Sequence, residues 1–315
     1  SFGSLIHAVA QQATEAGLDL PQNHTAVSDE DNIDEITQWM ISRYKTLRGD
    51  LNAIDDPEER YKALGKDAKA SVALRNIATY FVKSNRTGYP SNNTETITVG
   101  TLDHAEAERQ FAARFDFDDI LDAYNAIDGN APISRDELIA IMGALVDGWP
   151  ETGMSDRLTV RLSGRIDRLE HRRTADGREQ VRLIDYKTGK DNVKFKNIGD
   201  VVSNKDSGHY LAIMQLFLYC YALKNDANIT NFDVSVGLQP IIYKIKDMGT
   251  SGITHDKNMI TNLFSDENSG IYNEFLSEMA GVINNFFDKK VPFTQCENDK
   301  KAECKYCRFI EFCRR

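Results

Sequence analysis

This sequence of 315 residues has no long apolar run, no secretion signal and few cysteines. No segment approaches the roughly 20 apolar residues that span a bilayer, and no signal peptide opens the chain. We therefore expect a cytoplasmic protein without membrane contact. Only five cysteines occur, and four of them lie between Cys296 and Cys313. In a reducing compartment such a cluster favours a metal site over a secreted disulfide framework.

The sequence has fewer basic than acidic residues, 38 Lys and Arg against 48 Asp and Glu. The net charge of -10 counts against a protein that holds nucleic acid by bulk electrostatics. No Gly-x4-Gly-Lys-Ser/Thr motif occurs, so the chain shows no ATPase site of that kind. Two neighbouring stretches are nevertheless basic, and either local phosphate contact or a solvated strand face would explain them. They contain Arg157, Arg161, Arg165, Arg168, Arg172 and Arg173, and then Lys187, Lys190, Lys194 and Lys196.

A β-hairpin is the clearest pattern in the chain. Apolar and polar residues alternate in 161–170 and again in 181–189, and an Asp-Gly turn signal lies between them at Asp176. A loop centred on Asp176 places Asp167 opposite Asp185, with Cβ atoms roughly 5 Å apart. Like charges so placed repel, which calls for a cation between them.

Lys187 brings a positive charge to these acids. It lies two residues beyond Asp185 and therefore projects from the same face of the strand. A slip of one residue would separate the acids onto opposite faces, so the inference depends on the turn. On the hairpin alone, solvated charges at strand ends explain these residues at least as well as a site does.

The surrounding residues resemble the core of the PD-(D/E)XK nuclease superfamily, in its RecB- and AddB-like branch. Gly164-x-x-Asp167, the hairpin, and then Asp185-Tyr-Lys-Thr-Gly189 carry the resemblance. It implies an α/β fold with a restriction-endonuclease-like core, in which helices flank a mixed sheet. We expect a first core helix over 1–19, a mostly helical insertion over 20–157, the nuclease core over 158–295 and a cysteine clasp over 296–315.

A histidine near the start of the chain fits the same set of motifs. The apolar period of residues 2–13 predicts a helix, and His7 lies about 100° from its apolar stripe. By position alone His7 would face solvent. Gly3-x-x-x-His7 resembles the motif that precedes the nuclease core, whose histidine binds the active-site metal. The resemblance therefore makes His7 a candidate metal ligand.

A strongly apolar helix is predicted over 209–223, and it carries two polar residues one turn apart, Gln215 and Tyr219. Polar groups buried without partners are costly, so this pair indicates a site unless both side chains reach water. Gln-x-x-x-Tyr also resembles the next motif of the family, whose residues position DNA near the metal. Cys220 in this helix is expected in the core.

The insertion carries little recognisable chemistry. Its apolar periods predict helices around 33–47 and 74–81, and Ser134 with Glu137 forms a capping-box pattern. Residues 105–111 resemble the Glu-x-x-Phe segment that leads into Gly-x-x-Asp in these nucleases. A long stretch separates the two motifs here, so Glu108 receives no role.

The cysteine tail has a metal-ligand spacing. Cys304, Cys307 and Cys313 follow the pattern Cys-x2-Cys-x5-Cys, close enough for thiolates to bind one soft cation or cluster. The pattern resembles the iron-sulfur clasp of AddB-type nucleases, whose fourth cysteine precedes the histidine motif. No cysteine precedes His7, so either the upstream ligand was lost by truncation or Cys296 completes a four-cysteine site by itself. The resemblance implies a [4Fe-4S] cluster, structural zinc fits the ligand count equally, and free thiols in an incomplete site are the alternative.

The chemistry implied by the resemblance is hydrolysis of DNA phosphodiester bonds with Mg2+ or Mn2+, which oxygen-rich ligands favour. The implied ligands are His7, Asp167, Asp185 and the backbone carbonyl of Tyr186. Lys187 beside two acids should stay protonated, and so would orient water or stabilise developing charge rather than act as a base. Gln215 and Tyr219 would hold the strand.

Residues 2–7 and 161–170 look most like the C-terminal nuclease module of AdnB-type helicase-nucleases. This implies an exonuclease that acts on DNA ends during double-strand-break resection, with helicase motor domains in the parent chain and a partner helicase-nuclease subunit. The chain opens directly on a helix, so we expect a piece of a longer polypeptide. Two other interpretations remain: an inactive nuclease-fold module that binds DNA or serves as a scaffold, and a zinc-stabilised interaction domain whose hairpin acids are surface charge.

Overall fold

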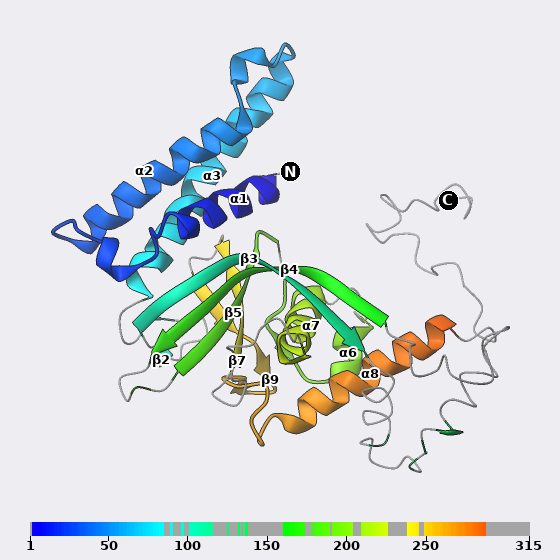
Figure 1. Ribbon diagram of the computed structural model, residues 1–315. Helices are drawn as coiled ribbons and strands as arrows, with labels where there is room; N and C mark the ends of the chain where they lie inside the picture. Colours follow the sequence, from blue (N-terminus) through cyan, green and yellow to red (C-terminus); the bar gives the residue numbers. More distant parts are fainter. Residues whose placement is uncertain are drawn as a thin grey trace.

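The computed structural model describes residues 2–84, 101–115, 160–173, 179–189, 191–203, 209–225, 238–245 and 249–287. It also describes residues 89–90 and 96–97 and the isolated positions 125, 132, 134, 136, 137 and 177. In these parts of the chain, helices lie on both faces of a central sheet (Figure 1). The mixed α/β architecture agrees with the predicted fold class.

The central sheet has five strands in the order β3-β4-β5-β7-β8. Within it β5 and β7 run parallel, and the other neighbours run antiparallel. The strands are β3 (Thr101–Phe115), β4 (Val160–Arg173), β5 (Glu179–Lys187), β7 (Leu238–Lys244) and β8 (Gly249–Gly252). The connection between this parallel pair contains helix α7 (Leu211–Asn225).

Strands β4 and β5 are the predicted hairpin. Arg168 pairs with Ile184 and Leu169 pairs with Leu183, which is the predicted register. In the connection Gly177 has a φ of 81°, a left-handed conformation that glycine adopts without strain. The Asp-Gly signal and the alternation of side chains were therefore sufficient to determine which residues of the two strands share a face.

Strand β3 shows that the prediction of a mostly helical segment over 20–157 is wrong for residues 101–115. These residues are rich in Ala, Glu, Arg and Gln, all of which favour helices. They pair instead with β4, from Thr101 opposite Arg173 to Phe115 opposite Val160. Pairing with a long neighbouring strand outweighs a helix preference that is worth only a fraction of a kilocalorie per residue.

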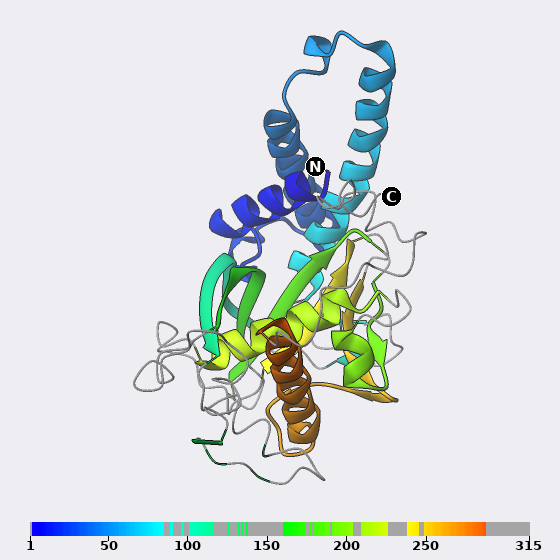
Figure 2. The same ribbon diagram turned by 90° about the vertical axis from the view of Figure 1, so that its right-hand side faces the viewer.

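Three helices cover one face of the sheet (Figure 1). They are α1 (Phe2–Glu15), α2 (Asp29–Arg48) and α3 (Pro57–Lys83), with short 3-10 turns at Pro21–Asn23 and Leu51–Ala53. Ser28 caps α2 by accepting the Asp31 N–H, and Asp56 caps α3 just before Pro57. Helices α2 and α3 form a long hairpin that projects away from the sheet (Figure 2).

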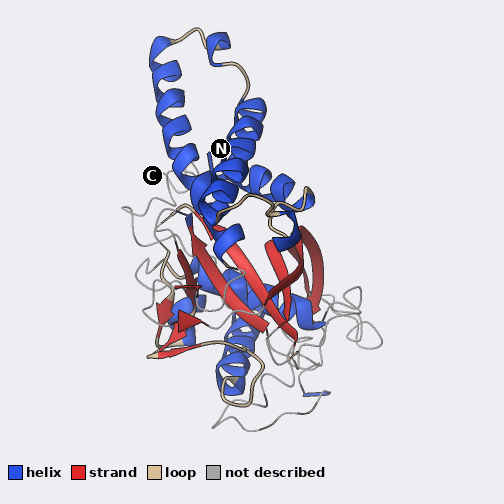
Figure 3. Ribbon diagram, turned by 90° about the vertical axis from the view of Figure 1, so that its left-hand side faces the viewer, coloured by secondary structure: helices blue, strands red, loops and turns tan. Residues whose placement is uncertain are grey.

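The opposite face carries α7 (Leu211–Asn225), α6 (Ile198–Val202) and α8 (Ser269–Phe287) (Figure 3). Successive side chains of β5 point to opposite faces of the sheet and so contribute to both hydrophobic clusters. Leu183 packs in the cluster with α7, whereas Ile184 packs in the cluster with α1 and α3. Cys220 of α7 is fully buried, which confirms the predicted core cysteine.

The segment 191–203 lies between β5 and α7 and is rich in polar residues. It contains β6 (Lys194–Phe195) and α6, anchored by the buried side chains of Phe195, Ile198 and Val201. Strand β6 pairs with β9 (Thr254–His255), which pairs with β10 (Asn258–Met259). A further two-stranded pair joins β1 (Tyr89–Pro90) to β2 (Thr96–Ile97).

Two predictions fall wholly or partly outside the described residues. Cys296, Cys304, Cys307 and Cys313 all lie there, so the clasp stays a prediction. The capping box is present, because the Ser134 N–H donates to Glu137 and the Glu137 N–H donates back to Ser134. Residues 138–159, which follow the capping box, lie outside the described residues. None of the described helices is long and apolar enough to cross a membrane.

Candidate active site

The two hairpin acids lie beside each other at one end of the β4–β5 ladder. Asp167 is one residue before Arg168, the first residue of β4 in that ladder. Its Oδ2 accepts the Tyr186 N–H at 2.8 Å. Asp185 is fully buried, whereas Asp167 keeps 11% of its side chain exposed. The predicted register therefore brings both carboxylates to the strand end.

A polar chain runs from Asp185 to helix α7. Lys187 Nζ lies 2.7 Å from Asp185 Oδ2 and donates to Gln215 Oε1 at 2.8 Å. Gln215 in turn donates from Nε2 to the hydroxyl of Tyr219. Lys187 therefore links the hairpin acid to helix α7. The residues Asp185, Lys187, Gln215 and Tyr219, predicted from two separate motifs, are thus joined in one network.

His7 reaches the same place from helix α1. Its Nδ1 lies 3.4 Å from Asp167 Oδ1, and its Nε2 lies 3.2 Å from the Tyr186 carbonyl oxygen. The side chain is 28% exposed, so it remains partly open to solvent while it contacts the hairpin. Both contacts are to oxygen atoms, so a protonated imidazole can donate to both of them and a neutral one to only one.

The surroundings of Asp185 disfavour the ionised form of its carboxyl group. Burial raises the pKa of its carboxyl group to about 7, and the neighbouring Asp167 carboxylate adds to the increase. The Lys187 ammonium and His7 act in the opposite direction. Asp185 Oδ1 is buried and makes no hydrogen bond to any described residue. A buried acid with a raised pKa and a free oxygen is typical of functional sites, where a further cation completes the charge balance.

The chemical types of the donor atoms at this site suit a hard divalent ion. They comprise two carboxylates, a backbone carbonyl and one imidazole, and Asp185 Oδ1 has no donor in the described surroundings. The side chains are arranged in pairs, His7 with Asp167 and Lys187 with Asp185. Among the described residues no group of three or more His, Cys, Asp or Glu side chains already converges to hold a metal ion.

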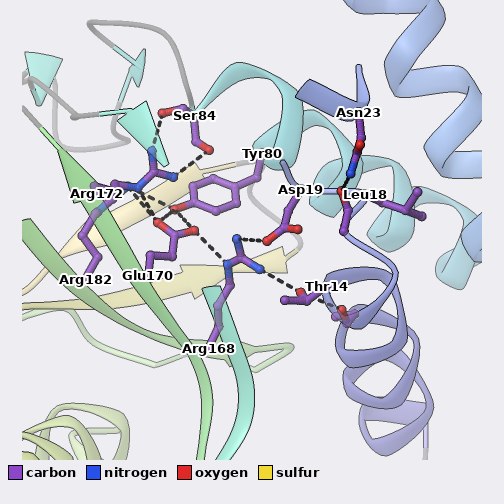
Figure 4. A network of polar contacts seen from close by, with 12 residues as sticks. Thr14, Leu18, Asp19, Asn23, Tyr80, Ser84, Arg168, Glu170, Arg172 and Arg182 are labelled. Carbon is purple, nitrogen blue, oxygen red and sulfur yellow. Dashed lines mark hydrogen bonds and ion pairs between the residues drawn. The ribbon is translucent and has the colours of Figure 1, made fainter. Parts of the chain in front are cut away.

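A buried network, not predicted from the sequence, holds α1 and α3 against the hairpin (Figure 4). Glu170 of β4 is fully buried, and both of its oxygens are bound, by Arg168 Nε at 2.8 Å and by Arg172 Nε at 2.6 Å. The hydroxyl of Tyr80 on α3 donates to the same carboxylate at 3.0 Å. Burial by itself would raise the pKa of Glu170, but the surrounding guanidinium groups hold it well below its usual range.

Arg168 extends this network to the end of α1. Its Nη2 donates to Asp19 at 2.7 Å and its Nη1 donates to Thr14 at 2.8 Å. Arg172 donates to the carbonyl oxygen and the hydroxyl of Ser84, just after α3. The network thus fixes both helices over the sheet, and α1 is the helix that carries His7. The Arg-x-Glu-x-Arg pattern of 168–172 was the available signal, since residues two apart on a strand share a face.

The structure corrects the expected position of two arginines and places Glu108 in a strand. Arg168 and Arg172 are almost completely buried, so neither is a solvated strand-face residue or a phosphate contact. Glu108 lies in β3 between Ala107, opposite Arg168, and Arg109, opposite Ile166. Its position in the register is therefore across from Asp167, close in space despite the long intervening segment.

The family model of the PD-(D/E)XK nuclease superfamily matches residues 1–314. The chain belongs to the PD-(D/E)XK nuclease superfamily. Members of this superfamily hydrolyse phosphodiester bonds of nucleic acids, usually with divalent metals such as Mg2+ or Mn2+. The match spans the hairpin, α1 and α7, which are the elements that supply the candidate site of this superfamily member. Among curated proteins none matches the chain.

Proposed function

We propose that the chain is the DNA-cleaving module of a helicase-nuclease, in which Mg2+ or Mn2+ supports phosphodiester hydrolysis at the hairpin acids. The observation that carries this proposal is the approach of His7, Asp167, Asp185 and Lys187 to one strand end, from positions spread over the chain. His7, Asp167, Asp185 and the Tyr186 carbonyl would hold the cation. When bound, it would polarise the phosphoryl group and lower the pKa of a water molecule.

The residues of the chain divide the remaining work. Lys187 has three N–H donors, and its described contacts, Asp185 and Gln215, leave one for a phosphate oxygen or the attacking water. An ammonium fixed at that point stabilises charge that develops during the reaction. Gln215 and Tyr219 keep the ammonium in place and offer amide and hydroxyl groups to the DNA strand.

The finer assignment follows the motifs. We propose a RecB- and AddB-like module, closest to the AdnB type, that acts as an exonuclease on DNA ends delivered by helicase motor domains and a partner subunit during break resection. A substrate delivered by a motor would allow a module with a net charge of -10 to act on DNA. The cysteine tail would hold a [4Fe-4S] cluster or zinc, and metal analysis of anaerobically purified protein distinguishes the two.

Cleavage of linear DNA tests the proposal. We expect single- or double-stranded linear DNA to be degraded with Mg2+ or Mn2+ and to remain intact with EDTA. Asp185→Ala and Lys187→Ala should abolish cleavage while the circular dichroism spectrum stays unchanged. The matched controls Asp103→Ala and Lys194→Ala, at exposed positions, should cleave normally. Equal activity in the unaltered chain and in both site variants would refute the assignment.

A further inference from the structure

Helix α1 is attached to strand β4 at two points. Near the start of the helix, His7 Nδ1 lies 3.4 Å from Asp167 Oδ1. Near its end, the Thr14 hydroxyl accepts an N–H from Arg168 Nη1 at 2.8 Å. Asp167 and Arg168 are successive residues of β4, so one short stretch of backbone holds the helix at both points. The candidate metal ligand and the threonine are therefore tied to the same part of the hairpin.

The two attachment points lie on one side of α1. Thr14 follows His7 by seven residues, which is almost two full turns and a separation of about 10 Å along the helix axis. The buried side chains of this helix are all apolar, and two of them are alanines. Burial of apolar surface has no directional preference, so it holds the helix on the sheet without fixing its exact rotation. The hydrogen bond to Thr14 supplies that direction.

Arg168 is a rigid partner for this contact (Figure 4). Its guanidinium is buried, lies over the ring of Phe81 on α3 with Cζ 4.8 Å from the ring centroid, and donates from Nε to Glu170. Its Nη2 donates to Asp19, just beyond the end of α1. A planar guanidinium held in this way loses little further freedom when Nη1 binds Thr14. Groups on β4 and α3 thus determine where the hydroxyl of Thr14 lies.

The Thr14 hydroxyl makes two different hydrogen bonds. It donates to the carbonyl oxygen of Ala10, one turn earlier, at 3.1 Å, and this leaves its lone pairs for Arg168. Valine has nearly the same shape without the oxygen atom, so Thr14→Val removes both bonds and little packing. A change at this position is therefore specific to the hydroxyl.

His7 has little tolerance for movement of α1. Its ring lies 3.4 Å from Asp167 Oδ1 and 3.2 Å from the Tyr186 carbonyl oxygen, at the long end of hydrogen-bond distances. A shift of the helix by one residue would move the side chain about 1.5 Å along the axis and turn it by about 100°. A fraction of that shift is enough to break both contacts.

We propose that Thr14 and Arg168 are positioning residues for the candidate metal site, which set the rotation of α1 and thereby present His7 to the hairpin acids. The inference rests on the proposed nuclease function and extends it to a residue two helical turns from His7. Both residues act only through His7. Their contribution to metal binding should therefore vanish when His7 is absent.

A double-mutant cycle tests this dependence. Binding of Mn2+ is measured by electron paramagnetic resonance without DNA, at a temperature well below the Tm of every variant. Thr14→Val should raise the Kd for Mn2+ roughly tenfold, and Thr14→Ser, which keeps the hydroxyl, should bind as the unaltered chain does. The matched control is Thr79→Val, which removes a hydroxyl that bonds to the Arg75 carbonyl oxygen within α3, and it should leave the Kd unchanged.

The decisive comparison is made in a His7→Ala background. There Thr14→Val should cause no further change in the Kd for Mn2+. An equal effect of Thr14→Val in both backgrounds, or no effect in the unaltered chain, would overturn the positioning role.

A second measurement needs neither metal nor cleavage. The rings of His7 and Tyr186 meet edge to face with their centroids 5.9 Å apart, so each ring shifts the NMR signals of the other. The His7 ring signal of the metal-free chain is assigned by its loss in His7→Ala. Thr14→Val should move this signal towards that of a free histidine, whereas Thr14→Ser and Thr79→Val should leave it in place.

The two measurements separate the positioning role from the nuclease function. If the unaltered chain cleaves DNA while Thr14→Val changes neither the His7 signal nor the Kd for Mn2+, the positioning role is wrong and the nuclease stands. If both change as expected and linear DNA is never cleaved, the positioning role stands and the nuclease function fails. If the unaltered chain binds no Mn2+, the metal site is refuted, and the His7 signal alone decides whether Thr14 and Arg168 place the ring.

Discussion

Asp185→Asn should change how the stability of the protein depends on pH. The Asp185 carboxyl group is fully buried, and burial together with Asp167 raises its pKa to about 7, from an ordinary value of 3.8. The folded state therefore binds a proton at this group more tightly than the unfolded state does. Its contribution to the free energy of unfolding is complete below about pH 4 and is lost as the pH rises through about 7.

The size of the effect follows from the pKa difference. One pH unit corresponds to about 1.4 kcal/mol, so the whole shift represents roughly 4 kcal/mol. Between pH 5 and pH 8 the part that is lost is roughly 2.5 kcal/mol, because the unfolded group is already mostly ionised at pH 5. An asparagine carries no charge at either pH. The variant should therefore lack this component of the pH dependence.

Urea unfolding in EDTA at pH 5 and pH 8 measures the difference. The unaltered chain should lose roughly 2.5 kcal/mol more than Asp185→Asn over this interval. Asp103→Asn, at an exposed acid, is the control and should follow the unaltered chain. At pH 8, Mg2+ should raise the Tm of the unaltered chain and leave that of Asp185→Asn unchanged, because a ligand stabilises the state that binds it. Parallel pH profiles for the unaltered chain and Asp185→Asn would refute the account of a buried, charge-strained acid.

Three further substitutions test the surroundings of the site. Glu170→Gln leaves buried guanidinium groups without their shared carboxylate, so the free energy of unfolding should fall by about 3–5 kcal/mol in urea; a loss below about 1 kcal/mol would contradict the network. Tyr80→Phe removes the hydroxyl that donates to Glu170 and should cost about 1–2 kcal/mol, measured in the same way, and an unchanged midpoint would show that this hydrogen bond contributes nothing. Gln215→Ala removes an acceptor of Lys187 and should lower kcat at least tenfold with little change in Tm, and an unaltered kcat would exclude a role in positioning the ammonium.

The hairpin could be predicted from the sequence because its determinants are local. Alternation in 161–170 and 181–189 and the glycine of the turn set the register, and that register alone placed Asp167 beside Asp185. The helix faces of α1 and α3 were likewise readable from their apolar periods, since Ile6, Val9 and Ile77 are all buried. The roles assigned to these site residues stay predictions until cleavage is measured.

The failures have a common cause. Residues 101–115 favour a helix locally, and only the neighbouring strand β4 makes them a strand. Arg168 and Arg172 were expected at a solvated or phosphate-binding surface, but Glu170, Asp19 and Ser84 surround them in the folded chain. Most of the residues that decide these structures are distant in the sequence. Glu170 is close to both arginines, but the local pattern is equally compatible with a solvated strand face.

The sequence by itself determined which residues face together within each helix and hairpin, because side-chain direction repeats with the period of the backbone. Only the tertiary structure brings the side chain of His7 into contact with the hairpin, 179 residues from its contact Tyr186. The physical reason is the packing of α1 and α3 on the sheet, held by the ion pairs and hydrogen bonds around Glu170. Such contacts join segments whose spacing along the chain carries no period, so no local pattern encodes them.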